Sequence, residues 1–294
     1  MAGDPRFPDR RDDRIRVGGY SFHVTDWGGA SSEDCIFFAH PTGFLGAVWK
    51  PLLTSLRRAG VTARLVSYDQ RGHGLSSKPD EGYEWDHFVA DTAGILKALG
   101  IRNALGVGHS AGATTLAGVA AAEPGLLRGL VMLDPVLLDP VMAQAMEEAG
   151  VSNPMAARTR TRRMVWPSRE ELFAAFRHRP PYATWTDEAL HAYVDEGTFE
   201  RPDGEVELLC PARAEAQVYT GAASYDAFAQ LPHVHVPALV VRGERSDTLD
   251  EARAQRAAGL LPQGRLVTLA GTTHFLPMEK PDDVAALVRD EWSR

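Results

Sequence analysis

A serine between two glycines is the first place in this sequence where chemistry is expected. Residues 106–113 read GVGHSAGA, so Gly108, Ser110 and Gly112 form a G-x-S-x-G pattern. An apolar run precedes the pattern and a helix-like segment follows it. In that setting the serine occupies a tight strand-to-helix turn that presents its hydroxyl at the end of a sheet. A glycine-rich turn with a helix-capping serine is the alternative, but the flanking elements favour a nucleophile.

A serine hydroxyl needs a general base before it attacks a carbonyl, and His274 is the best candidate. It lies in GTTHFLPMEKP, between the last strand-like run and the last helix-like segment. The other nine histidines do not follow a late strand in this way. We therefore predict that His274 removes the proton of Ser110.

An acyl-transfer intermediate also needs two N–H groups that bind its oxyanion. One is expected to be the amide of Ala111, directly after the serine. The other is expected from AHPTGF (39–44), where Phe44 is favoured over Gly43, although a simple turn is the alternative. The remaining residues that we expect beside the substrate are His109, Trp166 and Phe275.

The elements that must position these residues alternate along the chain. Short apolar runs follow a hairpin-like start, and their continuous apolar character is typical of strands covered on both faces. The strand-like runs cover residues 35–40, 63–69, 103–109, 129–134, 237–243 and 265–271, and the helix-like segments cover 46–59, 85–99, 111–122, 251–260 and 281–293. This order predicts an α/β fold with a mostly parallel, eight-stranded sheet and helices on both faces.

The alternation stops between residues 138 and 230. This stretch is poor in strand-like runs and is broken by NP, WP, RPPY and PDG, which predicts a helical cap inserted after the sixth strand. The expected organisation is therefore a flexible tail at 1–13, a core at 14–137 and 231–294, and a cap at 138–230.

Seven arginines lie within 22 residues of this cap, from Arg158 to Arg179. They could attract a substrate that carries a carboxylate. The alternative is an ordinary solvated helix face whose arginines pair with acids elsewhere.

Composition and charge exclude several classes of function. Hydrophobic residues make up 44% and charged residues 24% of the chain, which is typical of a globular protein. The formal net charge of −8 disfavours a nucleic-acid binder. The two cysteines, far apart and outside any CxxC pair, suggest neither a disulfide framework nor a zinc site. With no signal peptide or long apolar run, we expect a cytoplasmic protein without a membrane partner, and a homo-oligomer is compatible with the sequence.

Five motifs together resemble the α/β-hydrolase fold superfamily, in order and rough spacing. They are HPTGFLGAVW, YDQRGHGLSSKP, GVGHSAGA, VRGERSD and GTTHFLPMEKP. The resemblance implies a capped, esterase-like serine hydrolase that needs no metal or organic cofactor. It also implies that Asp69, Arg71 and His73 belong to a structural turn and not to the catalytic group.

The same resemblance leaves two candidates for the acid that orients the histidine. In this family the chain order is serine, acid, histidine, and the commoner acid stands three residues after a glycine that ends the seventh strand. Here that position is Ser246, and Asp247 comes one residue later. Asp134, at the tip of the sixth strand, matches relatives such as haloalkane dehalogenases, whose acid follows strand six.

The expected function is hydrolysis of a small-molecule ester, lactone or amide through an acyl-serine intermediate. Fold does not fix reaction, so two other classes stay open. One is cofactor-independent lyase or oxygenase chemistry in which His274 acts as the base. The other is a ligand-binding protein that has kept the fold without catalysis.

Overall fold

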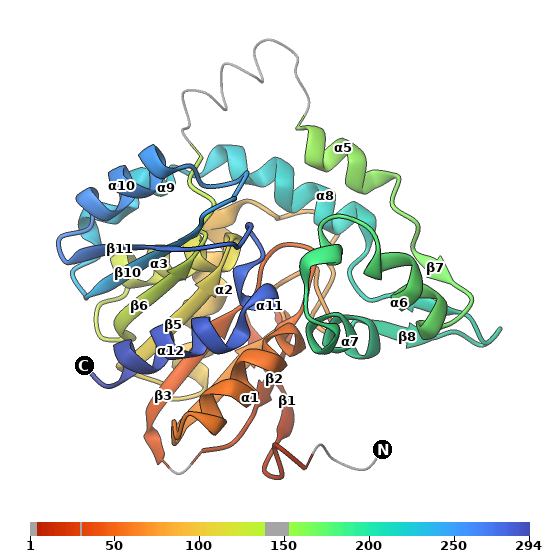
Figure 1. Ribbon diagram of the computed structural model, residues 1–294, viewed down its shortest axis with the longest axis horizontal. Helices are drawn as coiled ribbons and strands as arrows, with labels where there is room; N and C mark the ends of the chain where they lie inside the picture. The colour runs from red at the N-terminus through yellow and green to blue at the C-terminus, as the bar shows by residue number, and fades with distance from the viewer. Residues whose placement is uncertain (1–4, 30, 139–152) are drawn as a thin grey trace.

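An eight-stranded sheet forms the centre of the molecule (Figure 1), as the sequence predicted. The computed structural model describes residues 5–29, 31–138 and 153–294. The spatial order of the strands is β1-β2-β4-β3-β5-β6-β10-β11, parallel from β4 to β11, with β1 and β2 antiparallel. The strands are β1 (Arg11–Val17), β2 (Tyr20–Asp26), β3 (Ser31–Ala39), β4 (Ala63–Tyr68), β5 (Ala104–His109), β6 (Leu127–Leu133), β10 (Ala238–Gly243) and β11 (Gly264–Leu269).

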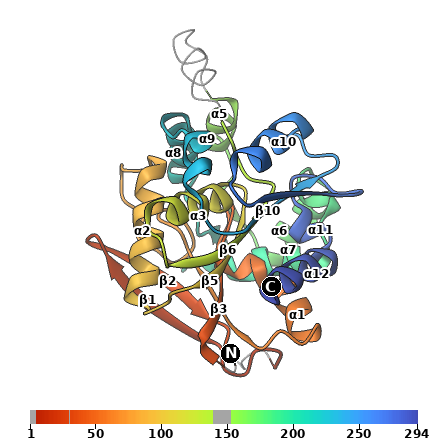
Figure 2. The ribbon, with the colours of Figure 1, turned by 90° about the vertical axis from the view of Figure 1, so that its left-hand side faces the viewer.

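Helices cover both faces of this sheet because its strands are apolar on both sides. In β6, Leu130 and Met132 join one hydrophobic cluster, whereas Val131 and Leu133 join the other. One cluster includes residues of α2 (Trp85–Ala98), α3 (Ala111–Ala122) and α10 (Glu251–Leu260); the other includes residues of α1 (Lys50–Arg58), α11 (Leu276–Glu279) and α12 (Pro281–Trp292). Figure 2 shows α2 and α3 on the side of the sheet opposite α1 and α12.

A long insertion separates β6 from β10, and residues 153–230 of it are called here the inserted segment. Most of this segment lies beside the sheet in Figure 1, but its last helix, at residues 227–230, packs against α3. The segment is mainly helical, as expected of the cap, but β7, β9 and β8 also form a small antiparallel sheet that was not predicted. These strands were missed because each has only two or three residues. Its main elements are α5 (Pro154–Arg160), β7 (Val165–Trp166), α6 (Arg169–Arg177), α7 (Asp187–Glu196), β8 (Thr198–Glu200), β9 (Val206–Leu208), α8 (Ala212–Gly221) and α9 (Ala227–Gln230).

Part of the expected tail at 1–13 is ordered. Strand β1 begins at Arg11, and Phe7 is buried with its ring 5.1 Å from that of Trp27. Arg10 binds Glu196 of α7 through both terminal nitrogens at 2.8 Å. The mixed charges of residues 1–13 suggested a flexible tail. In the fold, however, Arg10 pairs with Glu196 and the one aromatic residue, Phe7, packs into the core.

Candidate active site

Ser110 lies in a strained turn between β5 and α3. Its φ is +57°, a conformation that side-chain-bearing residues rarely adopt, and its N–H donates to the carbonyl of Leu133 at 2.9 Å. The two glycines of the motif permit this turn. A Cβ on Gly108 would lie 2.4 Å from the Ala113 Cα, and one on Gly112 would lie 2.2 Å from the Ala39 carbonyl oxygen. The two glycines of the motif are therefore required because any side chain at these positions would collide with neighbouring backbone.

His274 faces Ser110 from the loop after β11. Its Nε2 lies 3.0 Å from Ser110 Oγ, within hydrogen-bond distance. Glu279 of α11 fixes the loop, because its carboxylate accepts from the N–H and the hydroxyl of Thr273, both at 2.7 Å. Gly243 lets the loop approach β10, since a Cβ there would lie 2.2 Å from the Thr273 carbonyl oxygen.

Asp134, one residue beyond β6, contacts the other nitrogen of His274. The distance from His274 Nδ1 to Asp134 Oδ1 is 2.7 Å, and the Asp134 side chain is fully buried. The structure thus joins Ser110, His274 and Asp134 in one hydrogen-bonded chain. Asp247 is not part of it: its side chain is exposed, and the hydroxyl of the adjacent Thr248 donates to it at 3.4 Å.

Ser246 is a site residue whose role the sequence did not reveal. Its hydroxyl donates to Asp134 Oδ1 at 2.7 Å, and the Gly243 N–H donates to Asp134 Oδ2 at 2.8 Å. The Ser246 oxygen in turn accepts from the amides of Thr248 and Leu249. The position of Ser246 in the sequence could have indicated this role. Ser246 stands where the acid of this family is usual, and it therefore lies beside Asp134, which replaces that acid.

The two expected oxyanion donors differ in their surroundings. Ala111 is the first residue of α3, so its N–H has no acceptor within the helix. The Phe44 N–H makes a long 3.4 Å bond to the carbonyl of Pro41. The alternative donor, Gly43, is ruled out by its hydrogen bond, because its N–H donates to His73 Nε2 at 2.9 Å.

Buried histidines around this site act as neutral hydrogen-bonding groups. Burial lowers the pKa of His40 to about 4 and that of His73 to about 3, so both accept bonds from backbone amides. Burial also holds the pKa of His109 well below its usual range. His109 is fully buried and its Nε2 bonds to the His274 carbonyl at 2.8 Å, so its expected contact with substrate is wrong and it supports the histidine loop instead.

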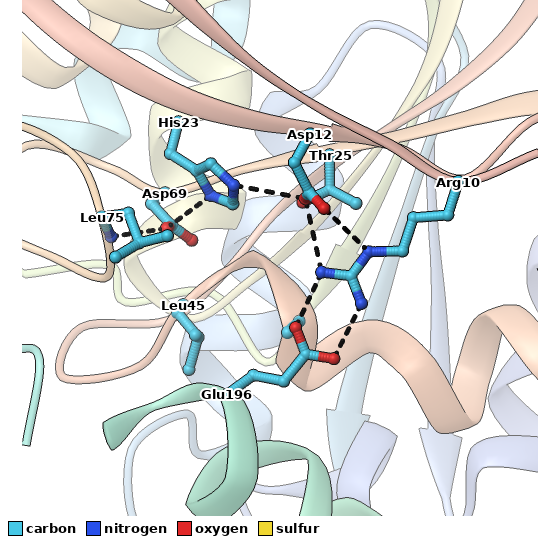
Figure 3. Close-up of a pocket in the computed structure, with 9 residues that line it drawn as sticks. Arg10, Asp12, His23, Thr25, Leu45, Asp69, Leu75 and Glu196 are labelled. Carbon is cyan, nitrogen blue, oxygen red and sulfur yellow. Dashed lines mark hydrogen bonds and ion pairs between the residues drawn. The ribbon is translucent and has the colours of Figure 1, made fainter. Parts of the chain in front are cut away.

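Asp69 anchors the loop that carries Phe44. Its carboxylate accepts from the Gly46 N–H at 2.7 Å and from the Leu75 N–H at 2.8 Å. His23 of β2 lies between Asp69 and Asp12, 2.9 Å from the first and 3.2 Å from the second. Figure 3 shows these side chains around a cavity of about 170 Å³ that is separate from Ser110, with its charged groups already paired.

A larger cavity, of about 390 Å³, lies between the inserted segment and the loop of Phe44. Phe44 and Phe275 line it with their ring centroids 6.1 Å apart, and Trp166, expected beside the substrate, lines it too. Ser110 is not among the lining residues, but Phe275 directly follows His274, and the centroids of these two rings are 5.0 Å apart. The other lining residues include Met155, Phe176, Pro180, Pro181, Tyr182 and Tyr219.

This cavity is rich in positive charge. Arg158, Arg162, Arg163 and Arg179 line it together with one carboxylate, Glu215. Arg162 pairs with Glu215, and Arg163 stacks over the Trp166 ring at 4.2 Å. Arg158 and Arg179 are exposed, and neither has an ion-pair partner among the described residues. A substrate carboxylate in this cavity would meet two exposed arginines that have no ion-pair partner in the part of the chain that the structure describes.

Residues 5–29, 31–138 and 153–294 contain no cluster of three or more His, Cys, Asp or Glu side chains that could hold a metal ion. Over the same ranges, no helix is long and apolar enough to cross a membrane.

A model of the alpha/beta hydrolase family matches residues 36–287. The chain belongs to the alpha/beta hydrolase family. The resemblance read from the five motifs is therefore confirmed, as are the α/β-hydrolase fold and the expectation of an enzyme that acts on ester or amide-type bonds.

Two relatives within this hydrolase family match along most of the chain. The 2-(acetamidomethylene)succinate hydrolase of Mesorhizobium japonicum is 29% identical over 269 residues, which cover 92% of this chain and 90% of the relative. The bifunctional esterase/perhydrolase of Acinetobacter calcoaceticus is 26% identical, with 92% and 97% of the two chains covered.

Solved alpha/beta hydrolases superpose over nearly the whole chain. The crystal structure of E-2-(acetamidomethylene)succinate hydrolase has a TM-score of 0.80 and 26% identity, and covers 97% of this chain and 100% of its own. The thioesterase domain from the curacin biosynthetic pathway has a TM-score of 0.76 at 20% identity and supports the fold alone.

Proposed function

We propose that this protein is a serine hydrolase that cleaves an ester or amide bond of a small, carboxylate-bearing molecule through an acyl-Ser110 intermediate. The observation that carries the proposal is the hydrogen-bonded chain of Ser110, His274 and Asp134, with distances of 3.0 and 2.7 Å. That geometry suits a nucleophile, its base and the group that orients the base.

In the first step His274 Nε2 removes the Ser110 proton while Oγ attacks the carbonyl carbon. Asp134, bonded to Nδ1, holds the proton on that nitrogen and stabilises the imidazolium that forms. The N–H groups of Ala111 and Phe44 bind the oxyanion, with the Phe44 N–H leaving its long bond to Pro41. His274 then gives its proton to the leaving alcohol or amine.

In the second step water replaces the leaving group. His274 removes a proton from this water as its oxygen attacks the acyl carbon, and the second tetrahedral intermediate collapses with return of the proton to Ser110 Oγ. The products are the free acid and the regenerated enzyme. Each proton transfer uses the same imidazole, so the cycle is complete without another titrating group.

The charge of the proposed substrate follows from the cavity. Arg158 and Arg179, which line it, are exposed and have no ion-pair partner among the described residues, and aromatic rings also line it. A small molecule with an apolar body and a carboxylate matches both features. The name of the Mesorhizobium japonicum relative describes a substrate with two carboxylates and an amide, which agrees with this choice.

The test of this proposal combines turnover with labelling. We expect the purified protein to hydrolyse p-nitrophenyl esters and to be labelled at Ser110 by a fluorophosphonate. Ser110→Ala should abolish labelling and lower kcat by about 10⁴-fold or more. Ser224→Ala, an exposed serine far along the inserted segment, is the matched control and should keep both properties.

Two outcomes would contradict the mechanism. Hydrolysis that persists in Ser110→Ala would exclude the acyl-serine step. Labelling of Ser110 without turnover of any ester, thioester or amide would indicate a lyase or oxygenase that uses His274 as a base without acylation.

A further inference from the structure

A carboxylate inside the larger cavity has no part in the mechanism described above. Glu215 lies on α8, is 6% exposed, and lines the cavity together with Arg162. The distance between Arg162 Nη1 and Glu215 Oε2 is 2.5 Å, and Arg162 Nη2 donates to the Cys210 carbonyl at 2.9 Å. Arg162 is therefore fixed at two points and holds the carboxylate in one orientation.

The position of this carboxylate relates it to the reacting groups. A Cβ placed on Gly43 would lie 2.8 Å from Glu215 Oε1 and 3.3 Å from Oε2. Gly43 directly precedes Phe44, whose N–H is the proposed second oxyanion donor. The absence of a side chain at Gly43 thus leaves room for Glu215 against the oxyanion loop.

Glu215 is short of hydrogen bonds. Its Oε2 is buried and has no hydrogen-bond partner among the described residues, although it forms an ion pair with Arg162. Its pKa is raised by burial, against the lowering effect of the Arg162 charge. A buried ion pair without further hydrogen bonds does not stabilise a fold more than apolar side chains of the same size. Folding stability alone therefore does not account for a carboxylate at this point of the wall.

We propose that Glu215, oriented by Arg162, is a specificity residue that accepts a hydrogen bond from an amide N–H carried by the acyl part of the substrate. A carboxylate accepts and does not donate, so it selects a donor. Its place against Gly43 puts that donor near the carbonyl under attack. This inference rests on the proposed serine-hydrolase function and names the chemistry of the acyl group that the site prefers.

The experiment compares two esters that differ in one group. The p-nitrophenyl esters of N-acetylglycine and of acetoxyacetic acid have nearly the same shape. The first has an amide N–H at the position where the second has the bridging oxygen of its acetyl ester. Each rate is corrected for the uncatalysed reaction. We expect the wild-type kcat/KM to be about tenfold or more higher for the amide-bearing ester, since a hydrogen bond to a charged group is being compared with its loss.

Variants then test whether Glu215 is the acceptor. Glu215→Leu should lower the ratio of the two kcat/KM values to about one. The double variant Glu215→Leu/Arg162→Met should also lower this ratio to about one, without leaving Arg162 unpaired. It replaces the single variant as the test where the single variant does not fold. Glu207→Leu removes a half-buried partner of Arg201 that does not line the cavity, and it should leave the ratio unchanged.

The outcomes separate this inference from the proposed function. Equal hydrolysis of the two esters by the wild type, or an unchanged ratio in the double variant, would overturn the role of Glu215 while leaving the serine mechanism intact. Failure of the wild type to hydrolyse either ester, together with an unreactive Ser110 towards fluorophosphonate, would overturn the serine mechanism itself.

Discussion

The carboxyl end of the parallel sheet and the cavity wall of the inserted segment differ in how fully their polar groups are paired. At the sheet end, Asp134 accepts from His274, Ser246 and the Gly243 amide, all within 2.8 Å. In the cavity wall, Arg162 Nε, Trp166 Nε1 and Glu215 Oε2 are buried without a hydrogen-bond partner among the described residues. The protein supplies the hydrogen bonds of the Asp134 carboxylate, and we call Asp134 and its three partners the saturated region. We call the cavity wall, with its unpartnered groups, the unsaturated region.

The two regions differ in what they contribute to the proposed reaction. The saturated region holds His274 in an orientation that does not depend on the acyl group, because the protein supplies the hydrogen bonds of Asp134. The unsaturated region has buried polar groups whose cost is recovered when a ligand completes their bonds. Under the proposed function, the strand ends carry out the reaction and the inserted segment selects the substrate, so variants in the two regions should have different kinetic effects.

The largest effect is expected from the acid in the saturated region. Asp134→Asn should lower kcat by about 10⁴-fold, because an amide at this position favours the wrong tautomer of His274. Asp247→Asn should leave kcat within about twofold, since its side chain is exposed and is bonded to Thr248 and not to His274. Steady-state hydrolysis of one p-nitrophenyl ester by both variants measures this contrast. A large loss in Asp247→Asn with a small loss in Asp134→Asn would reverse the assignment.

The next largest effect should come from the unsaturated region. Arg158→Met/Arg179→Met should lower kcat/KM for p-nitrophenyl hydrogen adipate by about tenfold, mainly through KM, because two charge-assisted contacts are lost. Hydrolysis of p-nitrophenyl hexanoate, which lacks the carboxylate, should change little. Arg160→Met provides the control, because Arg160 is exposed and does not line the cavity. Equal losses with both esters would point to a structural role for the two arginines.

The contrast also explains which parts of the site could be predicted from sequence. Ser110 and His274 were predictable because steric and hydrogen-bonding demands of the turn and loop impose local patterns around them. The choice between Asp134 and Asp247 was not, because both follow strand-like runs and only the pairing of β6 with β10 decides which one reaches His274. Glu215 gave no recognisable pattern, and Ser246 was marked only by its place at the usual acid position, since each acts through contacts made across the fold.

A smaller effect within the saturated region is expected at Ser246. Ser246→Ala removes one of the bonds to Asp134 Oδ1 but leaves the Gly243 amide and His274 in place. We expect kcat to fall by about threefold to tenfold with little change in KM, as for the loss of one hydrogen bond that orients a catalytic group. A pre-steady-state burst of p-nitrophenol, compared with the wild type, locates the loss in acylation. An unchanged kcat would show that the remaining bonds suffice.

The smallest effect lies outside both regions, at His23. Burial opposes its charge, but hydrogen bonds to Asp12 and Asp69 raise the pKa of His23 to about 9, against an ordinary value of 6.5. A raised pKa in the folded state stabilises the fold fully below pH 6.5, and this contribution is lost as the pH rises through 9. Arg10 and Glu196 also line this cavity, where they are hydrogen-bonded to each other.

Screening limits the size of this contribution. A shift of this size corresponds to about 3 kcal/mol for a fully buried group, but Asp12 is 42% exposed, so we expect about 1–2 kcal/mol. Urea unfolding of the wild type and of His23→Gln at pH 6.5, 8 and 9.5 measures it. The free energy of unfolding of the wild type should fall across this range by about 1–2 kcal/mol more than that of the variant. Parallel pH profiles for the two proteins would mean that His23 does not gain a proton on folding. The hydrogen bond from the Gly46 N–H to Asp69, which anchors the loop that carries Phe44, would then not depend on the charge of His23.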